Sequence, residues 1–261
     1  GQMKAVAEDT VFEYFSSEIL EKLGPEVRGF LLKTAILPIM DARMAERLTG
    51  AGNAGRILSG LCRNNYFTEK RAYANPVYQY HPLFREFLLS RAKDSLADEL
   101  PMLRKKAAVI LYEAEKFEDA FSLFRDCAEW EWIIRLVMER GQSLIKQGRG
   151  GVLEDWIASL PRDALNNGPW LQYYLGLCRM PRDPAEGRAL LEKAFLIFRK
   201  QKDAAGVFLA WTGIVDSCIF GLNDLKLLDD WIPRLSRLTR SFGDLPPGAI
   251  ETRVASSMFM A

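Results

Sequence analysis

The sequence is poor in histidine and in cysteine. It contains one histidine and four cysteines among 261 residues, and the cysteines have neither CxxC nor CxxxC spacing. A chain of this length buries enough surface to be stable without a disulfide or a metal, and the spacing does not match a zinc site. Each cysteine lies in an apolar, helix-like stretch, so we expect buried thiols in a reducing compartment. The four residues are Cys62, Cys127, Cys178 and Cys218.

An excess of charge of one sign is also absent. The chain has 35 Lys and Arg residues against 34 Asp and Glu residues, so no global field attracts it to nucleic acid or to an anionic membrane. No apolar run reaches the roughly 18 residues of a membrane span, and residues 1–10 lack the pattern of a secretory signal. We therefore expect a cytoplasmic protein without a membrane partner.

The sequence contains no phosphate-binding loop of the form GxxxxGKS or GxxxxGKT. Without it, no lysine is placed to neutralise nucleotide phosphates, so we do not expect this chain by itself to bind a cofactor or hydrolyse ATP. No motif places a Ser, Cys or Asp partner beside the histidine, which removes the basis for a catalytic role. We predict that the chain is not an enzyme and has no catalytic or metal-binding residue.

The N-terminal region has the periodicity of short amphipathic helices. Apolar residues recur there at three- and four-residue spacings. Asp41 and Asn53 stand where the N-caps of the third and fourth helices are expected. The predicted helices cover residues 11–23, 25–37, 41–50 and 53–65.

The period then changes. Residues 66–73 and 75–80 are short, aromatic and roughly alternating, which predicts a β-hairpin that turns at Ala74 and Asn75. A further helix begins at Pro82. Helices followed by a two-stranded ribbon and one more helix form a winged-helix domain, which we place at residues 1–97.

From Asp98 onward, helix-forming stretches follow one another and no stretch has the pattern of a strand. Two of them share a small residue, a large one four positions later and a small one three after that, as in tetratricopeptide-like repeats. We predict a mainly α protein with a TPR-like α-helical superhelix at residues 98–261; a bundle without repeats would show the same periodicity. The triplets are Ala120, Phe124, Cys127 and Gly187, Leu191, Ala194.

Four segments resemble one family, the MalT-like, large ATP-binding transcriptional regulators of the LuxR class, which are signal-transduction ATPases. The resemblance keeps the family's segment order along nearly the whole chain, although the C-terminal residues match only as generic repeat helices. The segments are FLLKTAIL at 30–37, YFTEKRAYANPVYQYHPLFREFL at 66–88, DCAEWEWIIRLVMERG at 126–141 and LEDWIASLPRDALNNGPWLQYYLG at 153–176.

In that family a nucleotide-binding domain precedes a helical domain, a winged helix, a superhelical sensor and a C-terminal DNA-binding helix-turn-helix. The resemblance implies a regulatory and sensor fragment of a signal-responsive, ATP-dependent transcription activator, with ATP or ADP bound in the parent protein. It implies three partners: the upstream nucleotide-binding domain, a small-molecule inducer or protein signal on the repeats, and DNA through a further C-terminal domain. The stretch IETRVASSMFMA ends within an apolar helical pattern, so we expect a piece of a longer polypeptide.

His81 is the candidate site residue. It ends the second predicted strand and directly precedes Pro82, so it stands at a helix N-cap, beside N–H groups without intrahelical partners. The residue pattern leaves two interpretations open, an external phosphate or a carbonyl at a domain interface. The resemblance favours the phosphate, because in related ATPases the histidine that opens this helix touches the β-phosphate of ADP. Tyr80 and Pro82 depart from the Met and Asp of the family's motif.

The helix that begins at Pro82 is expected to have an apolar and a wet face. The spacing predicts that Leu83, Phe84, Phe87 and Leu88 are buried. It predicts that Arg85, Glu86 and Ser90 face solvent.

Two other functions stay open. The chain could be a scaffold for protein contacts alone, or its winged helix could bind DNA through the outer face of residues 53–65 and the wing residues Lys70 and Arg71. Residues 1–95 contain 13 Lys and Arg against 11 Asp and Glu, which is less basic than DNA-binding modules usually are. We therefore favour the regulatory function.

The C-terminal region has two further features. Residues 225–240 have basic and apolar faces, which a solvated helix explains without a membrane or a partner. A group of aromatic residues at helical spacing is expected to be core rather than the lining of a ligand groove. These residues are Trp130, Trp132, Trp156, Trp170, Tyr173 and Tyr174.

Overall fold

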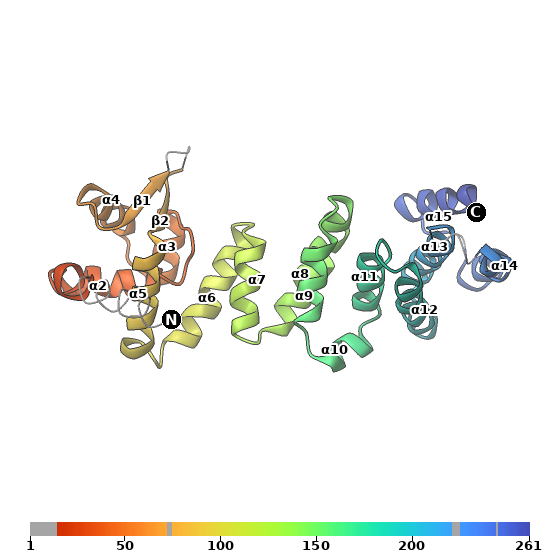
Figure 1. Ribbon diagram of the computed structural model, residues 1–261, viewed down its shortest axis with the longest axis horizontal. Helices are drawn as coiled ribbons and strands as arrows, with labels where there is room; N and C mark the ends of the chain where they lie inside the picture. The colour runs from red at the N-terminus through yellow and green to blue at the C-terminus, as the bar shows by residue number, and fades with distance from the viewer. Residues whose placement is uncertain (1–14, 72–74, 221–224, 244) are drawn as a thin grey trace. The chain divides into compact units, whose positions relative to one another are not determined.

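The computed structural model describes residues 15–71, 75–220, 225–243 and 245–261 (Figure 1). The chain forms two compact units, residues 1–129 and residues 130–261. The predicted fold class is confirmed: the protein is mainly α, with one small hairpin in the first unit and helices throughout the described part of the second. Each unit is described by itself.

The first unit begins with the helices and hairpin of a winged helix. A short π-helix, η1, comes first; of the predicted helix at 11–23, residues 11–14 lie outside the described part. The elements in order are η1 (Phe15–Leu20), α2 (Pro25–Thr34), α3 (Ala42–Thr49), α4 (Ala54–Arg63), β1 (Thr68–Arg71), β2 (Val77–Tyr80) and α5 (Pro82–Ser95).

The helix boundaries of this unit agree with the predicted ones only in part. Asp41 is confirmed as an N-cap, because its carboxylate accepts a 2.8 Å bond from the Met44 N–H. Asn53 occupies the N-cap of α4 without capping it; its amide instead donates to Glu26 of α2 at 2.9 Å. The helix predicted to run to residue 37 ends at Thr34, since Leu37 precedes Pro38 and its N–H turns back to the Thr34 carbonyl.

The hairpin is antiparallel, with Thr68 opposite Tyr80 and Arg71 opposite Val77. Both strands are four residues long, shorter than predicted, and residues 72–74, where part of the turn was expected, lie outside the described part. A bridge that sequence reasoning missed adds Met40 to the edge of β2, where Met40 and Tyr78 exchange backbone hydrogen bonds of 3.0 and 2.7 Å. The α2–α3 connection is thereby fixed to the hairpin.

Two further helices, α6 (Leu100–Glu113) and α7 (Phe117–Asp126), pack against each other and complete the first unit. The helix α6 also packs on α3, where the Lys106 ammonium donates to the Leu48 carbonyl at 3.2 Å. Ala120 and Phe124 of the first predicted triplet are fully buried. The compact unit thus extends past residue 97, to residue 129. The division into a winged-helix domain at 1–97 and a repeat region at 98–261 stays a prediction.

The second unit is built from helices packed on their neighbours in sequence; α11, α12 and α13 lie side by side in Figure 1. The helices α11, α12 and α13 each pack on the next, as in TPR-like arrays, whereas α9 packs on α8 and α11, and α15 packs on α13. The elements are α8 (Trp130–Lys146), α9 (Gly150–Ala158), α10 (Arg162–Asn167), α11 (Pro169–Arg179), α12 (Pro184–Gln201), α13 (Ala204–Phe220), η2 (Leu225–Leu227), α14 (Leu228–Phe242) and α15 (Ala249–Met260).

Glycines allow α11 and α12 to approach closely. A Cβ atom on Gly187 would lie 2.9 Å from the Gly176 carbonyl oxygen and 2.9 Å from the Cα of Met180. A Cβ on Gly176 would meet the Gly187 oxygen at the same distance. The triplet prediction is thus confirmed here, since Gly187 permits the approach while Leu191 and Ala194 are fully buried beside it.

A buried carboxylate fastens α15 to α13. Asp216 is only 2% exposed; its oxygens accept bonds of 2.5 Å from Arg253 and 2.7 Å from Ser257 of α15. A buried charge that is both paired and hydrogen-bonded resists removal of either partner, because the remaining group would lie unsatisfied. The sequence gives no signal of this contact, since the partners lie 37 and 41 positions apart.

The prediction that all four cysteines are buried is half right. Cys178 and Cys218 are buried, whereas Cys62 and Cys127 are partly exposed because each lies at the C-terminal end of a short helix. Burial raises the pKa of the Cys178 thiol to about 12, so this sulfur stays protonated and unreactive at neutral pH.

The substitution Gly187→Ala should lower the free energy of unfolding by about 1–3 kcal/mol, because the new methyl group meets backbone atoms that cannot rotate away. Gly151→Ala is the matched control: a Cβ there meets nothing within 4 Å, so stability should be unchanged or higher by up to about 1 kcal/mol. Urea denaturation followed by circular dichroism measures both. Equal stability of the two variants would contradict the close packing of α11 on α12.

Candidate functional site

His81 lies where sequence reasoning placed it, at the N-cap of the 14-residue helix α5. Its carbonyl accepts the first helical bond, 2.9 Å from the Arg85 N–H, and its own N–H donates to the Phe67 carbonyl at 2.8 Å. The side chain does not cap the helix and is exposed. Among the described residues the imidazole makes only an edge contact with the Phe67 ring, and neither ring nitrogen forms a hydrogen bond there.

The preceding residue fixes the position of His81. Tyr80 is 1% exposed, and its hydroxyl lies 2.7 Å from the Thr34 hydroxyl, which itself donates to the Phe30 carbonyl in the last turn of α2. Burial raises the pKa of Tyr80 well above its usual value, partly offset by the Thr34 bond, so the phenol remains a neutral hydrogen-bonding group. The end of β2 is therefore tied to the end of α2.

Arg85 forms a second tie at the same junction, and here the prediction of a solvent-facing residue is wrong. Its Nε donates to the Ala35 carbonyl at 2.8 Å and its terminal nitrogen to the Ile36 carbonyl at 3.0 Å. These carbonyls follow the last turn of α2, where a cation is favoured by the helix dipole. Burial lowers the pKa of Arg85, and Asp119 of α7 opposes that shift.

The start of α5 presents donors to an anion. Pro82 has no N–H, so the first free backbone donors are those of Leu83 and Phe84, which have no intrahelical partner in an α-helix. Together with the positive end of the dipole and an imidazole, they form a surface to which a phosphate oxygen could bind.

Exposed apolar side chains flank His81. Leu83 was predicted to be buried, but it is 38% exposed, because it lies at the edge of the helix face that buries Phe84, Phe87 and Leu88. Phe67 is 37% exposed beside it, and Phe15, Phe67 and Phe84 have ring centroids 4.9–5.9 Å apart. An apolar margin around a polar group is typical of a surface that another domain covers.

Part of the face considered for DNA contact packs against the rest of the domain. Arg56 and Arg63 of α4 are exposed, as are Lys70 and Arg71 of β1. Ser59, at the centre of the same face, is half-buried and lies 3.2 Å from the Tyr78 hydroxyl. The exposed cations therefore border a surface whose middle packs against the hairpin.

The aromatic group of the second unit divides into two sets. Trp156, Tyr173 and Tyr174 are buried, as predicted for core residues, while Trp130, Trp132 and Trp170 are half-buried.

In the part of the chain that the structure describes, no three His, Cys, Asp or Glu residues are grouped as metal ligands, and no helix is both long and apolar enough to cross a bilayer.

The fold defines a winged-helix domain followed by helical repeats, with His81 at the N-cap of the last helix of the winged helix. Residues 16–100 match the family model of the MalT winged helix domain. This part of the chain is therefore similar to the winged helix domain of MalT. The matched range ends at residue 100 and includes His81 and all of α5.

Curated relatives extend the likeness into the second unit. The chain is 29% identical over 195 residues to the HTH-type transcriptional regulator MalT of Serratia proteamaculans (strain 568), and 28% identical to the proteins of the same name from Yersinia pestis (strain Pestoides F) and Yersinia pseudotuberculosis serotype O:1b (strain IP 31758). Each match covers 73% of this chain and 21% of the relative. The chain thus spans about a fifth of the length of these relatives.

Replacing Arg85 by Met should lower the free energy of unfolding by about 1.5–3 kcal/mol, because two carbonyls at the end of α2 lose a charged donor. Glu86→Gln, on the exposed face of the same helix, should leave stability within about 0.5 kcal/mol of the parent. Urea denaturation compares the three proteins. If Arg85→Met is as stable as the control, the tie between α5 and α2 is not what holds the His81 junction.

Proposed function

We propose that this chain is the regulatory part of a signal-responsive, ATP-dependent transcription regulator. In this proposal the winged helix stabilises the ADP-bound resting state of an upstream nucleotide-binding domain, and the helical repeats receive a small-molecule or protein signal. The relatives named above are transcriptional regulators, which supports the general role. DNA contact then belongs to a further domain of the parent protein.

The observation that carries the proposal is the exposed His81 imidazole at the start of α5. The hydrogen bonds of Tyr80 to Thr34 and of Arg85 to the Ala35 carbonyl fix the position of His81, and neither bond involves the imidazole. A histidine is a poor N-cap compared with Ser or Asp, so capping alone gives little reason for its presence. A phosphate oxygen of ADP fits the donors at this helix start, and the surrounding Phe67 and Leu83 surface fits coverage by the neighbouring domain.

The residues of this chain supply only part of a nucleotide site. His81 would donate a hydrogen bond to a phosphate oxygen, and the dipole of α5 would favour the negative charge there. The rest of the phosphate charge needs donors from the upstream domain. Because the histidine contact exists only while the two domains are together, it favours the closed arrangement over the open one by the strength of that contact.

In the full-length protein, His81→Ala should weaken ADP binding about ten- to a hundredfold, which corresponds to one charge-assisted hydrogen bond of roughly 1.5–3 kcal/mol. Basal activation without inducer should rise, because the resting state loses part of its stabilisation. Release of a fluorescent ADP analogue and a reporter assay measure the two effects. Ser90→Ala, on the exposed side of α5, is the control and should change neither.

Unchanged ADP affinity together with unchanged basal activity in His81→Ala would refute the phosphate role. That result would favour the scaffold interpretation, in which both units make protein contacts alone.

The isolated chain should not bind duplex DNA at physiological salt. Its exposed cations on α4 and β1 border a face whose centre packs against the hairpin, and phosphate neutralisation supplies most of the affinity of such domains. A gel-shift titration with random duplex at several salt concentrations tests this. A salt-dependent shift that Arg56→Ala and Arg63→Ala remove would instead support direct DNA binding by the winged helix.

A further inference from the structure

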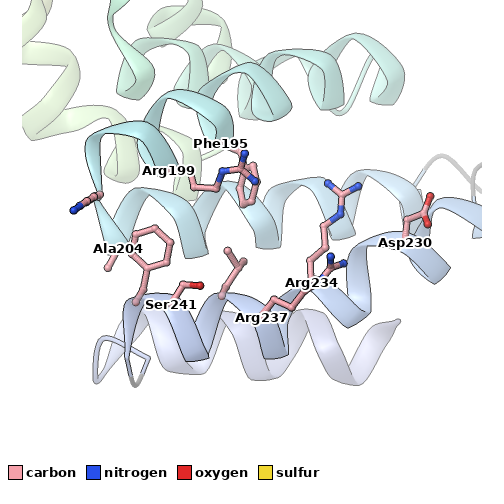
Figure 2. Close-up of a pocket in the computed structure, with 10 residues that line it drawn as sticks. Phe195, Arg199, Ala204, Asp230, Arg234, Arg237 and Ser241 are labelled. Carbon is pink, nitrogen blue, oxygen red and sulfur yellow. The ribbon is translucent and has the colours of Figure 1, made fainter.

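A basic groove lies in the second unit, where the end of α12 and the start of α13 face α14 (Figure 2). Its volume is about 820 Å³, within the range of small-molecule sites. Figure 2 shows Arg199 on one side of the groove, with Arg234 and Arg237 of α14 on the other. Lys202 contributes a fourth cation to the lining, against the single carboxylate of Asp230 among its described residues.

The helices that form the groove are held in place independently of these charges. The indole N–H of Trp211, in α13, donates to the Trp231 carbonyl of α14 at 2.9 Å. The Trp231 ring meets the Phe195 ring of α12 edge-on, with centroids 5.3 Å apart. Phe195 and Leu238 are 2% and 6% exposed, so the groove has a firm apolar base beneath its cationic sides.

Three of the four cations of the groove form no ion pair within the described residues, unlike two arginines at the α11–α12 connection. Arg179 and Arg182 form ion pairs with Glu154, and Arg179 also pairs with Glu186. By contrast, within the described residues the side chains of Arg199, Lys202 and Arg237 form no ion pair, and Arg234 stacks at 4.1 Å over the Trp231 ring.

The helix dipole explains a part of this arrangement. Arg199 and Lys202 lie at the C-terminal end of α12, where cations are favoured. It does not explain Arg234, which lies in the middle of α14 and is held over the Trp231 ring beside the groove. Like charges lining one groove repel one another, and an anion in the groove removes that repulsion.

We propose that this groove binds a phosphorylated small molecule with a ring or apolar portion. The planar guanidinium groups match the geometry of a phosphate and can each donate two hydrogen bonds to it. The apolar portion would contact Ala204 and Phe242 above the base formed by Phe195 and Leu238, and Asp230 would accept a hydrogen bond from a ligand hydroxyl. The proposal deepens the signal-receiving role given above to the helical repeats and rests on it for its regulatory meaning, but the binding itself can be measured on this chain alone.

The test is calorimetric titration of the 261-residue chain with 1-naphthyl phosphate, with pyrophosphate and with 1-naphthol. We expect 1-naphthyl phosphate to bind with one-to-one stoichiometry. Pyrophosphate and 1-naphthol should bind at least about tenfold more weakly, because pyrophosphate lacks the aromatic ring and 1-naphthol lacks the phosphate. Affinity for 1-naphthyl phosphate should fall as salt is raised. Lack of binding by 1-naphthyl phosphate up to about 1 mM, a concentration that detects weak complexes, overturns the proposal.

Variants locate the binding. Arg199→Gln and Arg237→Gln should each weaken 1-naphthyl phosphate about tenfold or more, and the double variant should bind no probe. Both residues are exposed, so the melting temperature without ligand should not change. Arg240→Gln, also exposed on α14 but outside the groove lining, should bind as the parent does. Unaltered binding by the double variant would overturn the site.

An acidic peptide is the competing ligand for a basic groove. If a hexaglutamate peptide binds more tightly than 1-naphthyl phosphate, the groove serves a protein partner and the small-molecule proposal is wrong. None of these titrations involves His81 or ADP, so their failure leaves the nucleotide role of the winged helix to be decided by the full-length His81→Ala measurements.

Discussion

The junction between β2 and α5 depends on a buried hydrogen bond between two hydroxyl groups, those of Tyr80 and Thr34, 2.7 Å apart. It joins the end of the hairpin to the last turn of α2, and the Arg85 guanidinium strengthens the same junction by binding two carbonyls just beyond that turn. Because Tyr80 and Arg85 hold the junction, the His81 imidazole is not needed to hold it. His81 is therefore presented at a fixed position with its imidazole exposed, which is what a contact to another domain requires.

The second unit is organised by a different constraint, the close approach of helix backbones. Gly176 and Gly187 leave no room for a side chain between α11 and α12, and α13 then packs on α12 through fully buried residues. The outermost helices are attached by specific polar bonds, α15 through Asp216 and α14 through Trp211. Because α14 is anchored through its backbone carbonyl and its apolar face, its arginines are not needed for attachment. They line the basic groove instead.

The two candidate sites are alike in how their packing residues and their ligand-facing residues are divided. In each, the groups that hold the elements together are buried and paired, whereas the groups offered to a ligand are exposed and have few partners within the fold. The proposed phosphate contact of His81 would report on the nucleotide state of a neighbouring domain. The groove of the second unit would report on a metabolite, and a common preference for phosphate would let one chain respond to both kinds of signal.

Much of the fold could be predicted from the sequence, because helix and hairpin formation depend on neighbours a few residues away. The spacing of apolar residues located most helices, Asp41 acted as the expected cap, and the His81–Pro82 pair marked the start of α5. The errors arose where a distant partner decided the outcome. Arg85 was expected in solvent, but carbonyls about 50 positions earlier bind it. Leu83 was expected in the core, but the packed face of α5 is centred on Phe84, Phe87 and Leu88.

The sequence by itself determined the fold class, the order of most elements and the place of the single histidine, since each of these follows from local periodicity or a contiguous motif. The tertiary structure alone decided that Asp216 is a buried clamp, that Met40 joins the hairpin and that Arg199, Arg234 and Arg237 line one groove. Residues that far apart in the chain meet only after the helices have packed. Their faces are selected by the fit of backbones and side chains across the interface, and no periodicity within one helix encodes its partner.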